Sequence, residues 1–157
     1  MRLNKRRRLE GKTNYKKRLI LLKGDYLRLV VRKTNKYIIL QITKSERAKD
    51  KVLHAVSTKN LLKHNWPIEK AGSLKSLSAA YLAGLLLGKK AKSLKQEVIL
   101  DSGLIPNTKG SRVYAAVKGV SDSGIIIKYN KKVMPDEEKM KNKYEFFEKI
   151  KENIKIK

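Results

Sequence analysis

The net charge of this chain limits what it can fold into by itself. Its 157 residues include 39 Lys and Arg but only 14 Asp and Glu, so the formal net charge is +25 at pH 7. A compact domain with this charge repels itself, and a polyanion is needed to offset the repulsion. Nucleic acid is the leading partner, because Lys and Arg release its condensed counterions when they bind phosphates. An anionic membrane surface is the rival partner.

What the sequence lacks disfavours several classes of protein. The longest nearly apolar run, Tyr81 to Leu87, is far shorter than the roughly 20 residues that span a bilayer. The apolar stretch Leu19 to Leu22 is too short for a signal peptide and no small-residue cleavage site follows it. The absence of Cys excludes disulfides and thiolate catalysis, and it is compatible with a reducing cytosol. We therefore expect a cytoplasmic protein with no membrane partner.

Composition predicts three parts of the chain: a basic arm with a short helix at 1–24, an α/β core domain at 25–130 and a helical extension at 131–157. The arm holds the basic run Lys5 to Arg8 and should be extended as far as Gly11 unless a partner orders it. Thr13 is expected to cap a helix that ends near Lys23. Its apolar side chains should dock on the core, and they are Leu19, Ile20 and Leu22.

Two runs, 28–33 and 37–43, alternate between apolar and polar residues and predict a β-hairpin. One face should be core, through Leu29, Val31, Ile38, Leu40 and Ile42. The opposite face is expected to carry Arg28, Val30, Arg32, Tyr37, Ile39, Gln41 and Thr43. Its guanidinium groups suit phosphates, its Tyr ring suits an unstacked base, and its amide suits a base edge or a 2′-hydroxyl. The alternative is an ordinary solvated sheet face.

The rest of the chain predicts helices that alternate with short strands. Strands are expected at 51–57, 98–101 and 125–127, and helices at 57–64, 73–94, 111–123 and from Pro135 onward. Gly84 and Gly88 should permit close packing of the long helix. The last helix should pack through Met140, Tyr144, Phe147, Ile150 and Ile154. The order of elements predicts a single α/β structure with a mixed β-sheet packed with helices.

The loop from Asn107 to Arg112 is a second candidate site. It runs directly into a predicted helix, so Lys109, Arg112 and free backbone N–H groups could converge on one phosphate. The alternative is a plain helix start, with Ser111 as its cap and Gly110 as a turn residue. Both interpretations can hold together.

The sequence lacks complete motifs for a nucleotide-binding, metal-binding or nuclease site. The run Gly84 to Lys89 has three residues between its glycines, whereas a nucleotide-binding P-loop needs four and a Ser or Thr after the Lys. His54 and His64 have no Cys or carboxylate cluster to complete a metal site. Four aspartates could form a two-metal nuclease site, but no spacing brings them together; they are Asp25, Asp50, Asp101 and Asp122. We expect no enzyme activity, cofactor, metal or small-molecule substrate.

Five segments carry a resemblance to a known family. They are RRRLEGKTNY at 6–15, RLVVR at 28–32, AAYLAG at 79–84, ILDSGL at 99–104 and TKGSRVYAAVKG at 108–119. Together they resemble the ribosomal protein eighteen family of the large subunit, in its archaeal form. The resemblance covers about Lys5 to Glu138, and the string from Lys109 to Gly119 is its most specific part. The tail after Glu138 does not align.

The resemblance implies a ribonuclease-H-like α/β topology without nuclease carboxylates, and binding of 5S ribosomal RNA in the large ribosomal subunit. It implies that the chain attaches 5S to 23S ribosomal RNA in the central protuberance, beside neighbouring large-subunit proteins. The RNA-binding residues implied are Lys5, Arg6, Arg7, Arg8, Lys12 and Lys16 in the arm, Arg28, Arg32, Lys33, Asn35, Lys36, Tyr37 and Gln41 in the hairpin, and Lys109, Ser111 and Arg112 in the loop. The alternative is an RNA- or DNA-binding module outside the ribosome.

Overall fold

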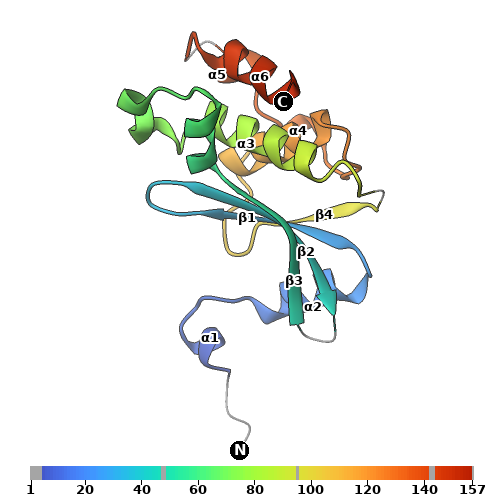
Figure 1. Ribbon diagram of the computed structural model, residues 1–157. Coiled ribbons are helices and arrows are strands. Elements are labelled where there is room, and N and C mark those ends of the chain that lie inside the picture. The colour runs from blue at the N-terminus through green and yellow to red at the C-terminus, as the bar shows by residue number, and fades with distance from the viewer. Residues whose placement is uncertain (1–4, 47–48, 95, 142–143, 157) are drawn as a thin grey trace, which may run out of the picture.

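The computed structural model describes residues 5–46, 49–94, 96–141 and 144–156. Within them, one mixed sheet has helices on both sides (Figure 1). Its strands lie in the order β3-β2-β1-β4, with β1 antiparallel to β2 and parallel to β4. The strands are β1 (Leu27–Lys33), β2 (Ile38–Glu46), β3 (Lys49–Ser57) and β4 (Val98–Asp101). This confirms the predicted α/β class with a mixed sheet.

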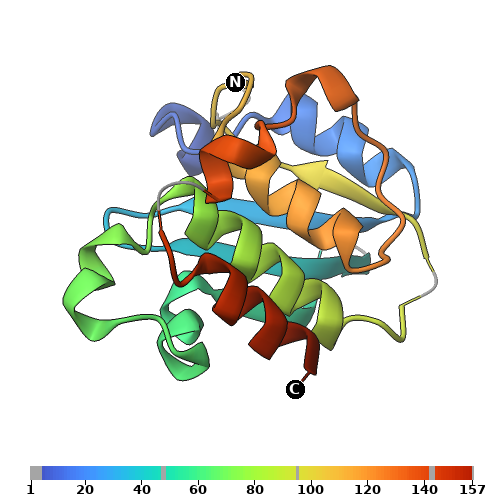
Figure 2. The same cartoon turned by 90° about the horizontal axis from the view of Figure 1, so that it is seen from above.

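The hairpin forms as its alternation predicted. Leu29 pairs with Ile42 and Val31 with Leu40, and these side chains are at most 1% exposed. They face the layer that contains α3 (Leu77–Lys90) and α4 (Arg112–Asp122), which covers one side of the sheet (Figures 1 and 2). The five side chains predicted as the aliphatic face are all in the core.

Helices α3 and α4 pack closely because glycines lie where they touch. A Cβ on Gly84 would collide with the backbone oxygen of Ala116, and one on Gly119 would collide with that of Tyr81. The close-packing role predicted for Gly84 is thus confirmed. Helix α3 is shorter than predicted, because Ser76 caps it: the Ala79 N–H donates to the Ser76 hydroxyl at 3.2 Å. Before it comes a separate 3-10 helix, η2 (Ile68–Ser73).

The remaining elements differ in detail from the predictions. The helix expected at 57–64 is a 3-10 helix, η1 (Thr58–His64), and another, η3 (Lys131–Val133), precedes the C-terminal helices. In place of a strand at 125–127 there is a single parallel bridge between Val98 and Ile127. No described helix is long and apolar enough to cross a membrane.

The C-terminal helix divides in two, α5 (Glu137–Lys141) and α6 (Phe147–Ile156). Its predicted seam nonetheless packs on the core. Met140, Phe147, Ile150 and Ile154 are at most 2% exposed, and Tyr144 is half-buried against them. Lys89 of α3 donates to the backbone oxygens of Ile154 and Lys155, both at 2.8 Å, which satisfies carbonyls at the end of α6.

The arm contains two helices, α1 (Arg6–Leu9) and α2 (Tyr15–Lys23), on the side of the sheet opposite α3 (Figure 1). The predicted cap was wrong, because Asn14 and not Thr13 accepts the hydrogen bond, from the Lys17 N–H at 3.1 Å. The predicted docking of Leu19 and Ile20 was also wrong, since they are 59% and 62% exposed. Leu22 is half-buried, as predicted, and so are residues 15, 18 and 21, which is the spacing of one helical face. The expected extended arm up to Gly11 was wrong for residues 6–9, which form α1. Residues 1–4 lie outside the described part.

Candidate RNA interface

Arg28 is the most buried charge in the described part of the chain. Its side chain is 1% exposed, and it donates from Nη2 to Asp50 Oδ1 at 2.6 Å and from Nη1 to Asp101 Oδ2 at 3.2 Å. A buried guanidinium needs such partners, because removing it from water is costly. The expected placement of Arg28 on an exposed face was therefore wrong. It therefore links β1 to β3 through Asp50 and to β4 through Asp101.

Arg32, four residues along the same strand, remains accessible. Its Nη1 donates to the Val31 and Asp101 backbone oxygens at 2.9 and 2.8 Å, and its Nη2 donates to Asp101 Oδ1 at 3.0 Å. Its side chain is still 43% exposed. Two of its five N–H donors, Nε–H and one on Nη2, take no part in these bonds. The structure therefore holds Arg32 in a fixed orientation with donors to spare.

Asp101 and Gly103 fix Arg32 from one side. Asp101 Oδ1 also accepts the Gly103 N–H at 2.9 Å, which closes a turn at the end of β4. Gly103 has φ +61, and a Cβ there would lie 3.1 Å from Arg32 Cζ and Nη1 and 3.3 Å from Nη2. Three nearly equal distances mean that Gly103 lies against the flat face of the guanidinium. A side chain at this position would displace Arg32.

An exposed ion pair links the arm helix to the sheet. Arg18 Nη2 of α2 lies 2.9 Å from Asp50 Oδ2 of β3. Partial burial raises the pKa of Asp50, but hydrogen bonds from Arg18 and Arg28 outweigh it and hold that pKa below its usual value. Asp50 thus stays charged and joins one cation from the arm to one from the sheet.

The arm cations are all exposed, and they are Lys5, Arg6, Arg7, Arg8, Lys12 and Lys16. Arg6 Nε and Lys12 Nζ bind the carboxylate of Glu10 at 2.6 and 2.8 Å, which lowers the pKa of Glu10. Arg7 Nε donates to the Thr13 hydroxyl at 2.8 Å. Such exposed contacts are weak and exchange readily with phosphate.

The other predicted residues lie in two places. At the hairpin tip, Lys33, Asn35 and Lys36 are exposed and Tyr37 is half-buried, whereas Gln41 lies within β2 opposite Val30 and is also half-buried. At the start of α4, Lys109 and Arg112 are exposed; Ser111 occupies the cap position, but in the part of the chain described its hydroxyl makes no capping hydrogen bond. Gly110 has φ +68 and turns the chain, as predicted.

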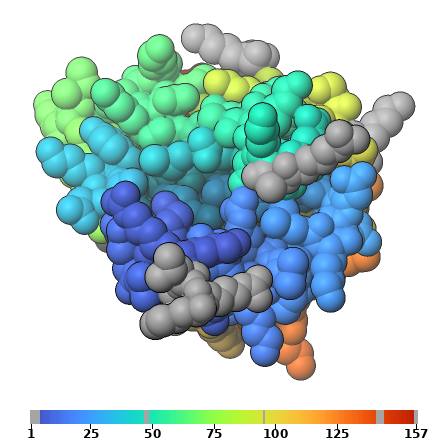
Figure 3. All heavy atoms as spheres, turned by 90° about the horizontal axis from the view of Figure 1, so that it is seen from below, coloured from blue at the N-terminus to red at the C-terminus, as the bar shows by residue number. Residues whose placement is uncertain are grey.

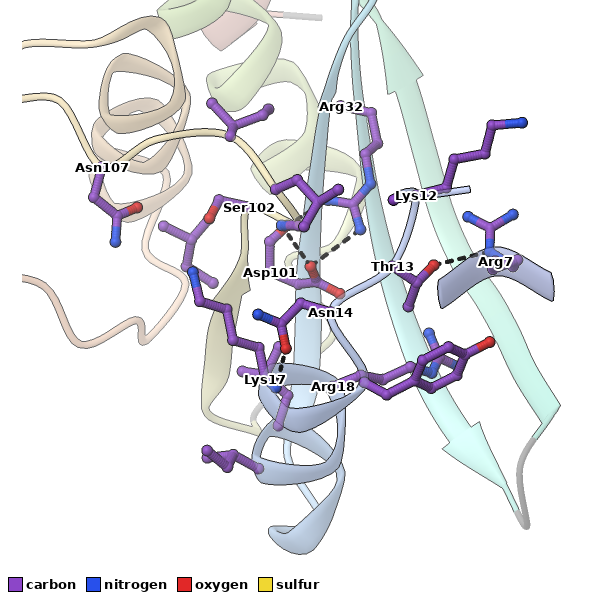
Figure 4. Close-up of a pocket in the computed structure, with 18 of the residues that line it drawn as sticks. Arg7, Lys12, Thr13, Asn14, Lys17, Arg18, Arg32, Asp101, Ser102 and Asn107 are labelled. Carbon is purple, nitrogen blue, oxygen red and sulfur yellow. Dashed lines mark hydrogen bonds and ion pairs between the residues drawn. The ribbon is translucent and has the colours of Figure 1, made fainter. Parts of the chain in front are cut away.

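A groove of about 1020 Å³ separates the arm from the loop after β4. We call it the arm groove. Seen from below, the arm lies across this side of the molecule beside the strands (Figure 3), and the close-up shows side chains of both walls turned into the groove (Figure 4). Cations line it from both sides: Arg7, Lys12, Lys17, Arg18, Arg32 and Lys33. Its apolar lining is Ile20, Leu21, Leu100, Leu104 and Ile105.

Sequence reasoning did not select several of these groove residues. Lys17 and Arg18 stand in the basic run that includes Lys16, so charge density alone could have found them. Leu104 and Asn107 carry no such signal, because only the fold brings the loop after β4 opposite the arm. The groove is thus a product of tertiary structure.

The carboxylates do not form a nuclease site. Asp50 and Asp101 are both paired with Arg28, and Asp122 instead accepts a hydrogen bond from the Tyr81 hydroxyl at 2.8 Å. Burial and this carboxylate raise the pKa of Tyr81. Among the described residues, no three His, Cys, Asp or Glu side chains are grouped so as to hold a metal ion.

Comparison with known proteins shows which sequences this chain is similar to. A model of the family described as "Ribosomal large subunit proteins 60S L5, and 50S L18" matches residues 1–98. Large ribosomal subunit protein uL18 of Korarchaeum cryptofilum is 45% identical over 150 residues, which cover 94% of this chain and 75% of the relative. Those of Methanosphaera stadtmanae and Methanoregula boonei are 40% and 41% identical over 140 residues, covering 88% of this chain and 70% and 78% of the relatives. The chain belongs to this family of ribosomal proteins, which is structural and not enzymatic.

Proposed function

We propose that this protein is a structural constituent of the large ribosomal subunit in the cytoplasm, where it binds 5S ribosomal RNA and attaches it to 23S ribosomal RNA in the central protuberance, beside neighbouring large-subunit proteins. The observation that carries this proposal is the cationic surface formed by the arm and β1 around the arm groove. Membership in a family of large-subunit proteins supports the ribosomal role.

The geometry favours a folded RNA over a flexible one. The exposed arm cations can follow a phosphate backbone, while Arg32 is held rigidly by Asp101 and Gly103 at the groove wall. A pre-oriented guanidinium loses little conformational entropy on binding and suits bidentate phosphate contacts. The exposed arm cations would contribute affinity for phosphates in general. The fixed Arg32 would determine how the protein is positioned on an RNA of a particular shape.

Binding to purified 5S RNA over a range of salt concentrations tests the proposal. Several phosphate contacts should make log K fall linearly with log salt, with a slope of about −0.7 to −0.9 for each contact. A 5S-sized hairpin RNA of unrelated sequence is the control, and it should bind more weakly at every salt concentration. Equal affinity for both RNAs, or a flat salt dependence, would contradict a specific 5S role.

Sedimentation in cell extract tests the assembled state. The chain should migrate with large subunits even in high salt, because a ribosomal protein is held by many contacts at once. Recovery of the chain only at the top of the gradient would favour the alternative, a nucleic-acid-binding module outside the ribosome.

A further inference from the structure

The arm groove has two walls of different origin. Residues of the arm form one wall, and β1, the end of β4 and the loop after it form the other (Figure 4). Its volume of about 1020 Å³ slightly exceeds the range of about 300–1,000 Å³ that small-molecule pockets occupy. A single nucleotide fits such a space, whereas a base-paired helix does not.

The charge of the groove selects an anion. Six lining residues are Lys or Arg, and Asp101 is the one carboxylate that lines it among the described residues. The Asp101 side chain is only 8% exposed and is already bound by Arg28 and Arg32. Little negative charge therefore reaches the groove, and a phosphate within it would be favoured from both walls.

The groove also offers surfaces for a base. The flat face of the Arg32 guanidinium that is turned away from Gly103 is a stacking platform, and guanidinium planes stack on unpaired RNA bases. Leu104, 52% exposed, adds apolar surface to the lining of the same groove. The exposed Asn107 amide on the loop wall can both donate to and accept from a base edge (Figure 4).

From these observations we propose that the arm groove receives one unstacked nucleotide of the bound RNA, with its base on Arg32 and its phosphate on the cations of the arm. This inference rests on the proposed function, because it takes the RNA to be the ligand. A planar cation, an amide and apolar side chains that line one groove match a nucleotide better than acidic side chains, because Asp and Glu supply negative charge without a planar ring to stack. The Asp101-Ser-Gly103 turn then positions the platform.

Charge-conserving and charge-neutral variants test the proposal by 5S RNA binding. Arg32→Lys keeps the charge but loses the flat platform, so affinity should fall about tenfold while the salt slope stays unchanged. The double variant Leu104→Ala with Asn107→Ala alters two exposed side chains, so it should fold normally and lose affinity about fivefold to tenfold. Ile68→Ala, at a residue 82% exposed outside the groove, is the matched control and should bind like the wild type.

Crosslinking identifies the occupant. With 5S RNA containing 4-thiouridine, ultraviolet light should join one nucleotide position to peptides that contain Arg32 or Leu104, and the double variant should reduce that yield. Full affinity in both groove variants would overturn the proposal, and so would crosslinks confined to other surfaces. In assembled subunits, a separate protein–protein crosslinking reagent could instead join residues of the arm groove to a neighbouring protein. That result would assign the groove to an acidic protein segment and would also overturn the proposal. Failure of the wild type to bind 5S RNA would instead refute the proposed function.

Discussion

The two sides of the sheet are built on opposite principles. On the side of α3 and α4, backbones approach so closely that Gly84 and Gly119 have no room for a Cβ, and the side chains between the layers are apolar. On the side of the arm, strands and helix α2 are joined through Arg28, Asp50 and Arg18. The comparison indicates that close packing on the side of α3 and α4 is the main source of stability. On the arm side, ion pairs hold cations in fixed positions where a ligand can reach some of them.

The largest effect should come from Gly119→Val on the helical side. The new side chain would collide with the Tyr81 backbone oxygen, and two packed helices cannot move apart cheaply. We expect a loss of about 4–5 kcal/mol in the free energy of unfolding, measured by urea denaturation. Gly72→Val is the control, because a Cβ there meets nothing within 4 Å. Equal loss in both variants would mean that close approach of the helices is unimportant.

Arg28→Ala should show that the arm side also contributes to stability. It leaves the nearly buried Asp101 carboxylate with one of its two cations, and breaking a buried pair typically costs about 3–5 kcal/mol. We expect a loss of about 3 kcal/mol in the free energy of unfolding, because the Asp50 side chain is partly exposed and solvent can stabilise its charge. Arg28→Met, which fills the volume without a charge, should lose a similar amount. A loss below about 1 kcal/mol in chemical denaturation would make Arg28 dispensable to the fold.

The Asp50 carboxylate should make the arm side sensitive to acid. Its pKa is lowered in the folded protein, so its contribution is complete above the unfolded value of about 3.9 and is lost as the pH falls through the folded pKa. The stability difference between wild type and Asp50→Asn, about 1 kcal/mol at pH 7, should therefore shrink below pH 4. Urea denaturation of both proteins between pH 3 and 7 measures it. A difference that does not change with pH would be inconsistent with the ion pairs.

The smallest effect on stability should come from Arg7→Ala, within about 0.5 kcal/mol, because Arg7 is exposed. It should nonetheless weaken RNA binding and reduce the steepness of the salt dependence by about 0.7 to 0.9, which is the contribution of one phosphate contact. Lys90→Ala, on an exposed position of α3 away from the arm, should change neither quantity. An unchanged salt slope for Arg7→Ala would remove Arg7 from the interface.

The local sequence pattern was sufficient to predict most of the side chains that form the core. The alternation of 28–33 and 37–43 predicted the aliphatic face of the hairpin correctly, since successive side chains of a strand point to opposite faces. It was wrong about three side chains of the opposite face, because Arg28, Val30 and Thr43 are buried as well. The glycines of α3 predicted a close approach before the partner, α4, was known. The C-terminal seam was predicted from helical spacing even though a break divides the helix in two.

Pattern failed where a residue's neighbours come from distant segments. Leu19 and Ile20 are apolar and were expected to dock on the core, but α2 is held with Arg18 at Asp50, so that Leu19 is exposed and Ile20 lines the open arm groove. Nothing local to α2 reports the position of Asp50, 32 residues away. The same holds for Arg28, whose partner Asp101 is 73 residues distant in the chain.

The sequence by itself determined the charge excess, the order of strands and helices, and the aliphatic face of the hairpin, because these depend on composition and short-range periodicity. Only the tertiary structure decided which cations are available. Arg28 and Arg32 lie on the same face of β1. Arg28 is buried and paired with two carboxylates, whereas Arg32 lines the arm groove. The physical reason is that burial and pairing depend on chain segments that meet only on folding, and these set the free energy of exposing each charge.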